Sequence, residues 1–487
     1  MRLLAARPNT RLAAALPLIA IQAGLLLFVL FLSSREIKDA DLFFHLRTGA
    51  DILHSHHVPH TDPYSRAGPE HGALDIAYSW LFEIALASLH AALGWAGIKL
   101  FIALLGGLTA LLLMAEVYAR HKTLWATAFL AIALVGLSPV LTPRPWLFSA
   151  LFTLIELKLL FSFQDSGRPR ALLGLLPLYV LWANLHIQFV IGLVFIGVFA
   201  IANIVERRPR TSVILAAAAV LCAAATLINP YGFRVWSTIA QYASQSKALT
   251  QIQDASPPHF GNLPEVAAVL VFAIAAYTVL RASNRRVLLS LCLLTGLYFF
   301  LHSRRDIWLS ILTSGLVFAQ AARPTAKDTS AKDTPTLPPY SWAIVPISIL
   351  FFFAAGFGKS LNNSAEQKQL EGRYPFAAVA FVRSHLKPEG SLRGALYNSF
   401  DWGGFLIWAL PEIQVSMDGR INVHGEARTL RHWATWDGTS GWRNDTDLGS
   451  ANLVILERRA PLSAALARES LFAKVYEDSQ AVVFSRR

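Results

Sequence analysis

Residues 12–33 read LAAALPLIAIQAGLLLFVLFLS and contain no charged side chain. An α-helix needs about 20 apolar residues to cross the hydrocarbon core of a bilayer, so this stretch predicts a membrane-spanning helix. Arg2, Arg7 and Arg11 precede it, which is also the arrangement of a signal peptide. Because no small-residue cleavage site follows the stretch, we expect a retained first helix.

Similar apolar blocks recur along the whole chain. They lie near residues 96–118, 124–141, 146–163, 171–185, 187–205, 211–229, 264–281, 287–301, 306–321 and 341–357. The 487 residues are 54% hydrophobic and 15% charged, whereas a soluble domain carries about 25% charged residues. This composition excludes a disordered chain and a single soluble domain. It predicts a mainly α fold, a polytopic transmembrane helical bundle of about 11–12 spans. The region 171–205 is also compatible with one broken helix, and Cys222 and Cys292 inside the blocks define no disulfide framework.

The formal net charge of +12 indicates membrane topology rather than nucleic-acid binding. Lys and Arg collect in the cytoplasmic loops of membrane proteins, and no soluble segment carries a basic stripe with interleaved aromatic residues. With the N-terminus inside, the inner loops hold most basic residues of the membrane part, namely Arg120, Lys122, Arg168, Arg170, Arg207, Arg208, Arg210, Arg281, Arg285, Arg286, Arg323, Lys327 and Lys332. This bias predicts that the C-terminal part lies outside.

Residues 73–93, ALDIAYSWLFEIALASLHAAL, are apolar but carry Asp75, Glu83 and His90. As a non-spanning segment they form an amphipathic helix at the outer interface. As a membrane span they would reverse the inside-to-outside orientation of the helices that follow. The charge bias favours the first interpretation, so we expect residues 1–321 to form a transmembrane module with a first outer loop over residues 34–95.

The composition changes after residue 321. Residues 322–340 are rich in Pro, Thr, Lys and Asp and predict a cytoplasmic linker, and residues 341–357 predict a last transmembrane helix. Residues 359–487 alternate short apolar runs with turn residues, which is typical of a small α/β domain, here extracytoplasmic. The expected strands are 395–397, 414–417, 453–456 and 481–484, and the expected helices are 375–386 and 461–468.

The first outer loop holds ionisable side chains beside the membrane, where they are costly and therefore functional candidates. Asp39, Asp41 and His45 stand at the start of an expected amphipathic helix, and Asp62 follows. A carboxylate here can act as a general base towards a sugar hydroxyl or bind a divalent metal, or it merely caps a surface helix. Zinc binding is a minor alternative for four histidines that lack a metalloprotease spacing, His54, His56, His57 and His60.

Further polar groups interrupt the apolar blocks. Arg144 lies between two prolines, Arg304 and Arg305 join two later spans, and Asn184 and His186 fall inside the region 171–205. Guanidinium groups bind phosphate oxygens bidentately, although a lone interfacial arginine often only snorkels to the headgroups. Since these residues emerge on one predicted side, we expect a site for an anionic, lipid-borne substrate.

Spaced motifs run along most of the chain. They are Asp39-x-Asp41-x3-His45-Leu46-x2-Gly49, Pro59-x2-Asp62-Pro63-Tyr64-Ser65, Trp80-Leu81-x-Glu83, Trp182-Ala183-Asn184-Leu185-His186, Asn229-Pro230-Tyr231-Gly232, Tyr397-Asn398-Ser399-Phe400-Asp401-Trp402-Gly403-Gly404-Phe405 and Asp418-Gly419-Arg420. Together they resemble bacterial polytopic membrane proteins similar to C-type glycosyltransferases, which have the GT-C fold and use polyprenyl-phosphate sugars.

This resemblance implies a membrane glycosyltransferase of the hexosyltransferase type in the bacterial inner membrane. It would transfer a sugar from a polyprenyl-phosphate donor to an extracytoplasmic glycan, lipid or protein. The expected catalytic residues are Asp41, Asp39 and His45, and the expected substrate-binding residues are Arg144, His186, Asn184, Arg304, Arg305, Glu83 and Asp62. If a divalent metal such as Mg²⁺ or Mn²⁺ takes part, Asp39 and Asp41 are its expected ligands, and no other cofactor is expected.

The chain departs from the family pattern at two places. Ala40 separates the two aspartates, where dolichol-phosphate-mannose enzymes commonly show an adjacent Asp-Glu pair, and Phe43-Phe44 replaces the usual tryptophan. The sequence therefore leaves open whether Asp41 or Asp39 is the base and which sugar is transferred.

Two other functions compete with sugar transfer. A transporter or flippase for a lipid-linked saccharide would use the same outer cavity without an acidic base, although no convincing inverted repeat is present. A non-catalytic protein of envelope assembly is the third alternative. In the C-terminal domain, sugar stacking competes with a favoured core role for five tryptophans, Trp402, Trp408, Trp433, Trp436 and Trp442.

Overall fold

The structure is a computed structural model, and it describes residues 10–67, 77–121, 124–244, 246–252, 254–282, 285–321, 361–385 and 395–487. The expected linker 322–340 and the expected last transmembrane helix 341–357 lie outside the described residues.

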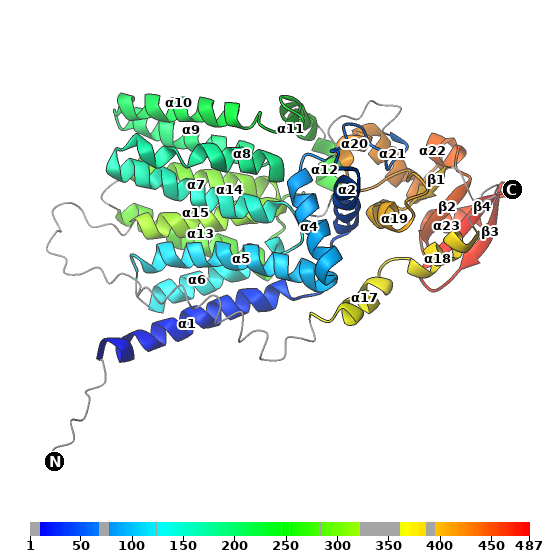
Figure 1. Cartoon of the computed structure of the whole chain (residues 1–487), viewed down its shortest axis with the longest axis horizontal. Helices are drawn as coiled ribbons and strands as arrows, with labels where there is room; N and C mark the ends of the chain where they lie inside the picture. The colour runs from blue at the N-terminus through cyan, green and yellow to red at the C-terminus, as the bar shows by residue number, and fades with distance from the viewer. Residues whose placement is uncertain are drawn as a thin grey trace, which may run out of the picture.

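The membrane part is a bundle of long helices that run side by side (Figure 1). Its helices are α1 (Thr10–Ser33), α5 (Trp95–Tyr118), α6 (Leu124–Gly136), α7 (Trp146–Ser166), α8 (Leu175–Leu185), α9 (Phe189–Val205), α10 (Pro209–Ala225), α13 (Leu263–Arg281), α14 (Arg286–His302) and α15 (Ile307–Ala321). Within the described part, α5, α7 and α13 are long and apolar enough to cross a membrane by length and composition. A backbone in lipid must satisfy its own hydrogen bonds, which favours helices for apolar blocks of this kind. The chain is a multi-pass membrane protein with a mainly helical fold.

The region 171–205 forms two helices and not one. His186 has an extended backbone between α8 and α9, with φ −163° and ψ 140°, and α9 begins at Phe189. The chain therefore turns back at the polar sequence Asn184 to Gln188.

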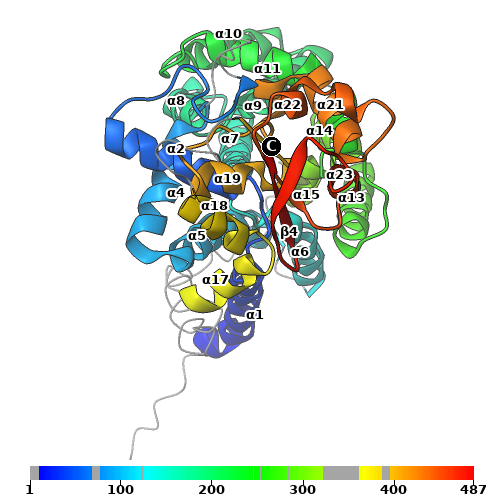
Figure 2. The same ribbon diagram turned by 90° about the vertical axis from the view of Figure 1, so that its right-hand side faces the viewer.

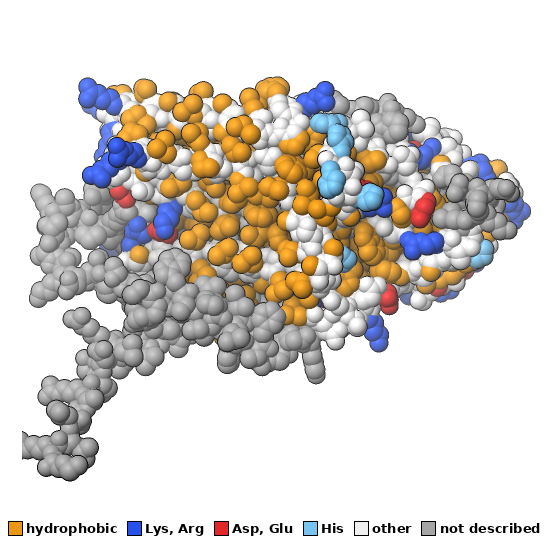
Figure 3. Space-filling model, in the orientation of Figure 1, with side chains coloured by type: hydrophobic (Ala, Val, Ile, Leu, Met, Phe, Trp, Pro, Cys, Tyr) orange, Lys and Arg blue, Asp and Glu red, His pale blue; other side chains and the backbone are white. Residues whose placement is uncertain are grey.

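The surface of the bundle has the pattern of a lipid-exposed protein. Hydrophobic side chains cover its flank, and Lys and Arg side chains gather at the end away from the C-terminal domain (Figure 3). Several large apolar side chains of the flank are exposed, including Leu104, Ile201, Val213, Leu221, Leu280 and Tyr298. Hydrocarbon tails accept such side chains without the cost that water would impose.

Two short helices, α2 (Leu42–Ser55) and α4 (Trp80–Leu93), lie across the other end of the bundle (Figure 1). The 14 residues of α4 reach only about 21 Å, which is too short for a span. The two helices touch at Gly49, where an added Cβ would lie 2.0 Å from the Glu83 carbonyl oxygen. The described part of 73–93 therefore lies across the bundle as a non-spanning helix.

The loops between the long helices carry shorter elements. They are η1 (Ser138–Val140), η2 (Pro169–Leu172), α11 (Arg234–Ser244), α12 (Ser246–Gln251) and η3 (Arg304–Asp306). In Figure 1, α11 and α12 lie at the same end of the bundle as α2 and α4.

The C-terminal domain is a small α/β unit that covers this end of the bundle (Figure 2). Its helices are α17 (Asn363–Glu371), α18 (Phe376–His385), η6 (Phe400–Trp402), α19 (Gly403–Ala409), α20 (Ile421–His424), α21 (Glu426–Trp436), η7 (Trp442–Asn444), α22 (Thr446–Gly449) and α23 (Pro461–Leu466). A sheet of order β1-β2-β4-β3 is built from β1 (Leu396–Asn398), β2 (Leu453–Glu457), β3 (Phe472–Glu477) and β4 (Ala481–Arg486). β1 and β2 are parallel, and the other pairs are antiparallel.

Two sequence-based expectations for this domain are wrong. Residues 414–417 do not join the sheet, because Val415 forms only an isolated bridge with Ser65 of the first outer loop. The strand Phe472–Glu477 was not expected, since half of its side chains are exposed at the edge of the sheet and give no apolar run.

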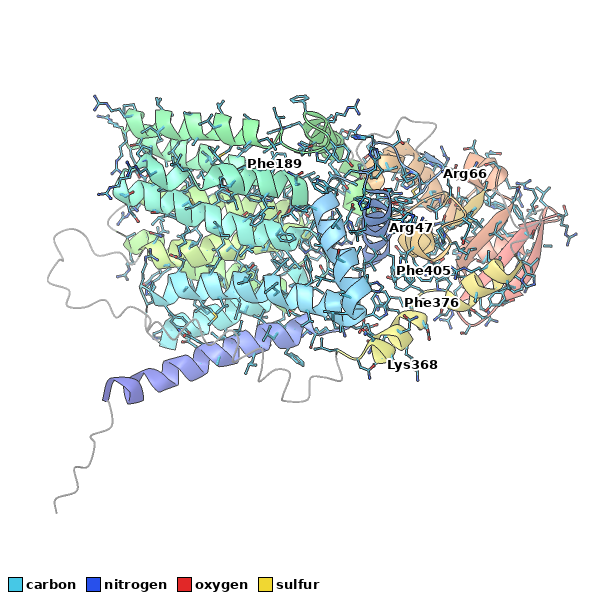
Figure 4. The ribbon with its side chains drawn as sticks, in the orientation of Figure 1. Arg47, Arg66, Phe189, Lys368, Phe376 and Phe405 are labelled. Atoms are coloured by element: carbon cyan, nitrogen blue, oxygen red, sulfur yellow. The ribbon has the colours of Figure 1, made fainter. Side chains whose placement is uncertain are left out.

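The C-terminal domain is fixed to the bundle by charge and by aromatic packing. Lys99 of α5 pairs with Glu366 of α17 at 2.6 Å, and both side chains are buried. The Phe43 ring of α2 packs edge-on against Phe405, with ring centroids 5.2 Å apart, and Phe405 also contacts Phe376 (Figure 4). The end of the bundle and the domain therefore share one core.

Candidate functional site

The site is centred on Arg144, which lies where α7 begins. Pro145 is the N-cap of α7, and prolines on both sides of Arg144 keep this turn out of the helix. The guanidinium bridges two carboxylates: Nε donates to Asp39, and Nη1 lies 2.5 Å from Asp41 Oδ2. It also stacks on the Trp146 ring at 5.1 Å. The first outer loop and α7 therefore meet through one ion-pair cluster.

Asp41 is at the N-cap of α2, but its side chain makes no capping hydrogen bond. Instead, Asp39 Oδ1 accepts a hydrogen bond from the Asp41 backbone N–H at 2.9 Å. The Asp41 carboxylate points to Arg144, so the geometry does not support the simple helix-capping alternative. Burial raises the pKa of Asp41 to about 6, against the opposing charge of Arg144. A carboxylate with a pKa in this range can accept a proton near neutral pH.

A second arginine stands beside the first. Arg305 in η3 pairs with Asp254 at 2.8 Å, and its guanidinium lies 5.8 Å from the centroid of the same Trp146 ring. The Arg305 backbone N–H also donates to the Asp254 carbonyl at 2.9 Å, which fixes this loop. Arg304 pairs with Glu265 of α13 at 3.3 Å.

Two cavities meet at this cluster. The larger has a volume of about 1100 Å³ and lies between the bundle and the C-terminal domain. The smaller, about 490 Å³, lies against the bundle near α9 and α14. Both are lined by the same six residues, Asp41, Arg144, Trp146, Ile252, Arg305 and Gly419. Asp41 is therefore reachable from two sides.

The smaller cavity contains two of the predicted histidines. His186 is hydrogen-bonded through Nδ1 to Ser149 Oγ at 2.7 Å, and that oxygen accepts a bond from Trp182 at 2.8 Å. His45 pairs through Nδ1 with Glu83 Oε1 at 2.9 Å. Burial lowers the pKa of His45 and raises the pKa of Glu83, so this pair is held as neutral groups. His45, Glu83 and His186 all line the cavity.

Two predicted substrate-binding residues lie outside both cavities. The Asn184 amide accepts from the Trp80 indole at 2.8 Å and donates to the Ile228 carbonyl at 2.8 Å, so it locks helices together. Asp62 accepts from the backbone N–H groups of Tyr64 and Ser65 and pairs with Arg420 at 2.9 Å. Their side chains are used within the protein, and their expected contact with substrate stays a prediction.

The donor set does not fit a divalent metal ion in this arrangement. Arg144 contacts Asp39 and Asp41, and the described residues contain no group of three or more His, Cys, Asp or Glu side chains that could hold a metal. The same result applies to the histidines of the first outer loop, where His60 packs its ring against Tyr231 instead.

The C-terminal domain contributes a contact that the sequence did not reveal. An added Cβ at Gly419 would lie 2.1 Å from Asp41 Oδ1, and at Gly404 it would lie 2.7 Å from the Ala40 carbonyl. Glycine is therefore required where the domain touches the Asp39–Asp41 segment. Asp254 and Tyr242, which line the cavities, were also missed as site residues. The sequence Asp254-Ala255-Ser256-Pro257-Pro258 was the available signal for Asp254.

No protein-family model and no curated protein sequence matches this chain. Solved structures do match, and they define a class: membrane glycosyltransferases with the GT-C fold, to which this chain is similar in fold. One is the oligosaccharyltransferase AglB from Archaeoglobus fulgidus in complex with an inhibitory peptide and a dolichol-phosphate, with 11% identity, a TM-score of 0.54, and coverage of 90% of this chain and 69% of that chain. Another is ArnT from Cupriavidus metallidurans bound to undecaprenyl phosphate, with 14% identity, a TM-score of 0.52, and coverage of 97% and 98%. At these identities the likeness shows the fold.

Proposed function

We propose that the protein is a membrane glycosyltransferase that moves a sugar from a polyprenyl-phosphate donor to an acceptor outside the cytoplasm. The observation that carries this proposal is the position of Asp41, a carboxylate with a raised pKa where two cavities meet beside two arginines. A transfer reaction needs two substrates that reach one base from separate sides. A carrier that only translocates a lipid needs no such base.

The smaller cavity suits the donor. Val190 and Ile191 of α9 and Phe299 of α14 give it an apolar side against the bundle, and Arg144 and Arg305 give it a cationic side. An isoprenoid tail and a phosphate have matching properties, since guanidinium binds phosphate oxygens in a planar fork. Support also comes from the two similar structures, one in complex with dolichol-phosphate and the other with undecaprenyl phosphate.

The reaction follows from these positions. Asp41 removes the proton from an acceptor hydroxyl, whose oxygen attacks the anomeric carbon of the donor sugar. The bond between that carbon and the phosphate oxygen breaks, and the polyprenyl phosphate leaves with the bonding electrons. Protonation of Asp41 removes one of the charges that hold Arg144. Arg144 and Arg305 then stabilise the charge that develops on the leaving phosphate.

We propose that no divalent metal takes part in this step, because Arg144 already forms ion pairs with both Asp39 and Asp41. Transfer measured in the presence of EDTA should equal transfer with added Mg²⁺ or Mn²⁺. A large loss that only the added metal reverses would assign Asp39 and Asp41 to metal binding instead.

The proposed location is the bacterial inner membrane, with a cytoplasmic N-terminus and an extracytoplasmic C-terminal domain. Basic residues of the loops, among them Arg120, Arg207 and Arg286, follow or precede helix ends opposite the C-terminal domain, as the positive-inside rule requires for a cytoplasmic face. Labelling of single cysteines introduced at Arg170 and at Arg443, in intact spheroplasts, tests this orientation: only the second should react.

The proposal is tested with the full chain reconstituted in proteoliposomes. A radiolabelled polyprenyl-phosphate sugar and membrane extract as acceptor source should give labelled product with the wild type and none with Asp41→Asn. A parallel assay measures movement of the labelled donor across the bilayer. Translocation that is unchanged in Asp41→Asn, without any transfer by the wild type, would favour a flippase. If the wild type shows neither transfer nor translocation, the result would favour a non-catalytic protein.

A further inference from the structure

One wall of the larger cavity belongs to the C-terminal domain. Phe400 and Asp401 of η6 form part of it, together with Trp433 of α21 and Glu457 at the end of β2. The rings of Phe400 and Trp433 pack edge-to-face, with centroids 5.3 Å apart and an angle of 62° between their planes. Both residues are only half-buried, so their rings are part of a surface that faces the cavity.

Trp402 also lines the cavity, but it is 6% exposed and belongs to the core shared with the bundle. The other tryptophans of the domain have different environments. Trp442 belongs to the core around β2 and is 9% exposed, and Trp408 packs against Phe43 at the junction with α2. Trp436 donates its indole N–H to Glu457 Oε2 at 3.0 Å. Trp433 therefore differs from the other tryptophans of the domain. Its ring lines the cavity, and among the described contacts it neither belongs to a core cluster nor donates a hydrogen bond to a carboxylate.

One of the two carboxylates of the wall, that of Glu457, is held in place beside the rings. Glu457 also accepts a hydrogen bond from the Ser399 hydroxyl, so its side chain is fixed from two directions. Asp401 is exposed to the cavity. Two carboxylate acceptors next to aromatic faces, one of them fixed, can receive hydroxyl hydrogen bonds while the rings cover C–H surface.

The net charge of the cavity argues against a strongly charged occupant. Its described lining contains five cationic side chains, Lys38, Arg144, Arg304, Arg305 and Arg373, and six anionic ones, Asp39, Asp41, Asp254, Glu265, Asp401 and Glu457. A polyanion is attracted by a cavity with positive net charge and a polycation by one with negative net charge. The positive and negative charges of this lining are nearly equal in number, so neither is favoured. A volume of about 1100 Å³ accommodates more than one sugar ring.

We propose that this wall, formed by Phe400, Asp401, Trp433 and Glu457, binds a saccharide, and that the acceptor of the transfer reaction is therefore a glycan. The proposal rests on the proposed function, because the same cavity has Asp41 at its other side. The acceptor sugar stacks on Trp433, its hydroxyl groups donate to Asp401 and Glu457, and a further hydroxyl reaches Asp41. Trp433 is accordingly a residue for acceptor binding and not for chemistry.

Binding is tested directly on the full chain in nanodiscs, without the donor. The probes are an array of neutral and amino-substituted oligosaccharides, followed by saturation-transfer NMR with those that bind. We expect the wild type to retain at least one oligosaccharide, and Trp433→Ala and Asp401→Asn to lose it by about tenfold or more. Trp125→Ala is the matched control, since Trp125 of α6 is 83% exposed and lies far along the bundle from this wall.

The outcomes separate this proposal from the proposed function. Loss of transfer is the result expected of Asp41→Asn under the proposed function, whereas loss of oligosaccharide binding is the result expected of Trp433→Ala and Asp401→Asn under this proposal. If no oligosaccharide binds the wild type, or if Trp433→Ala and Asp401→Asn bind as the wild type does, the saccharide site is wrong even when Asp41→Asn abolishes transfer. Preferred binding of a tetralysine probe would show that the carboxylates recognise cations and would also overturn it.

Discussion

The protein contains two clusters of aspartate and arginine at the same end of the bundle, and they differ in the surroundings of their carboxylates. Asp39, Asp41 and Arg144 line cavities. Asp62, Asp418 and Arg420 form the second cluster, whose side chains are at most 4% exposed. The residue types are alike, so the difference lies in what surrounds the carboxylates.

In the second cluster, the oxygens of Asp418 are fully used. Oδ1 accepts from the Arg420 backbone N–H and Nε, and Oδ2 accepts from Arg420 Nη2 and contacts His424 Nε2 at 2.9 Å. Burial alone would raise the pKa of Asp418, but Arg420 and His424 hold it well below its usual range. Such a carboxylate stays ionised and serves the structure.

In the first cluster, burial dominates over the attraction of Arg144, and the pKa of Asp41 rises to about 6. Asp41 therefore gains a proton easily, whereas Asp418 does not. The comparison teaches that an arginine partner by itself does not distinguish a structural carboxylate from a reactive one. A structural carboxylate is distinguished from a reactive one by the number of hydrogen-bond donors to it and by its access to a cavity.

The largest expected effect is on catalysis. Asp41→Asn should lower the rate of transfer by about 10²–10⁴-fold, because a general base is lost. Asp62→Asn is the matched change in the second cluster and should retain transfer in the folded fraction. Initial rates in proteoliposomes, corrected for the amount of monodisperse protein, measure both. Equal losses in the two variants would contradict the assignment of roles.

The second effect is on stability. Asp418→Asn leaves the buried Arg420 with Asp62 as its carboxylate partner and removes the second carboxylate charge, which should destabilise the protein by up to about 3–5 kcal/mol. Because the folded pKa of Asp418 is lowered, the wild type has this stabilisation above the ordinary aspartate pKa and loses it as the pH falls below that value. Thermal unfolding in detergent checks the difference at neutral pH. An unchanged melting temperature would show that this cluster does not hold the domain.

The third effect concerns the contact between the domain and the site. Gly419→Ala places a methyl group against the Asp41 carboxylate, and such overpacking costs about 1–3 kcal/mol. Transfer should fall by about 10-fold or more, while binding of the polyprenyl-phosphate donor changes less. Gly449→Ala is the control, since an added Cβ there has open space. Full activity of Gly419→Ala would mean that the domain does not sit on Asp41 during turnover.

The smallest effect is a change in pH dependence. The wild-type rate should rise with pH around the pKa of Asp41, about 6, since only the ionised form accepts a proton. The charge of Asp39 contributes to raising that pKa, so Asp39→Asn should move the midpoint to lower pH. Profiles of kcat/KM between about pH 4 and pH 8 show the direction. A midpoint that moves upward would contradict the described charge balance.

The sequence predicted the parts of the fold that the membrane itself dictates. Long uncharged runs can only be helices in a bilayer, and the alternation of sides already placed Arg144 and Arg305 near the first outer loop. The structural likeness confirms the GT-C fold that the motifs indicated. Topology placed Asp41, Arg144 and Arg305 on one side of the membrane, and packing brings them together. The proposed roles of these residues stay predictions.

The sequence did not reveal which polar groups pair with one another. Asp62 and Arg420 are 358 positions apart, and nothing local distinguishes Asp62 from Asp41. Asn184 stood in a suggestive motif, yet its partners are the Trp80 indole and a backbone carbonyl. Phe400 and Trp433 come from separate segments, and only the folded domain brings their rings together. Pairing over such distances depends on packing, which periodicity and composition do not encode.

The central claim is that the two arginines beside Asp41 hold the donor phosphate. A structure of the full chain with a bound polyprenyl monophosphate, determined by electron cryo-microscopy in nanodiscs, tests it most directly. We predict the phosphate within hydrogen-bond distance of Arg144 and Arg305, the isoprenoid tail against α9 and α14, and Asp41 next to the phosphate. A phosphate bound away from both arginines, with the Asp39–Arg144–Asp41 cluster untouched, would contradict the account.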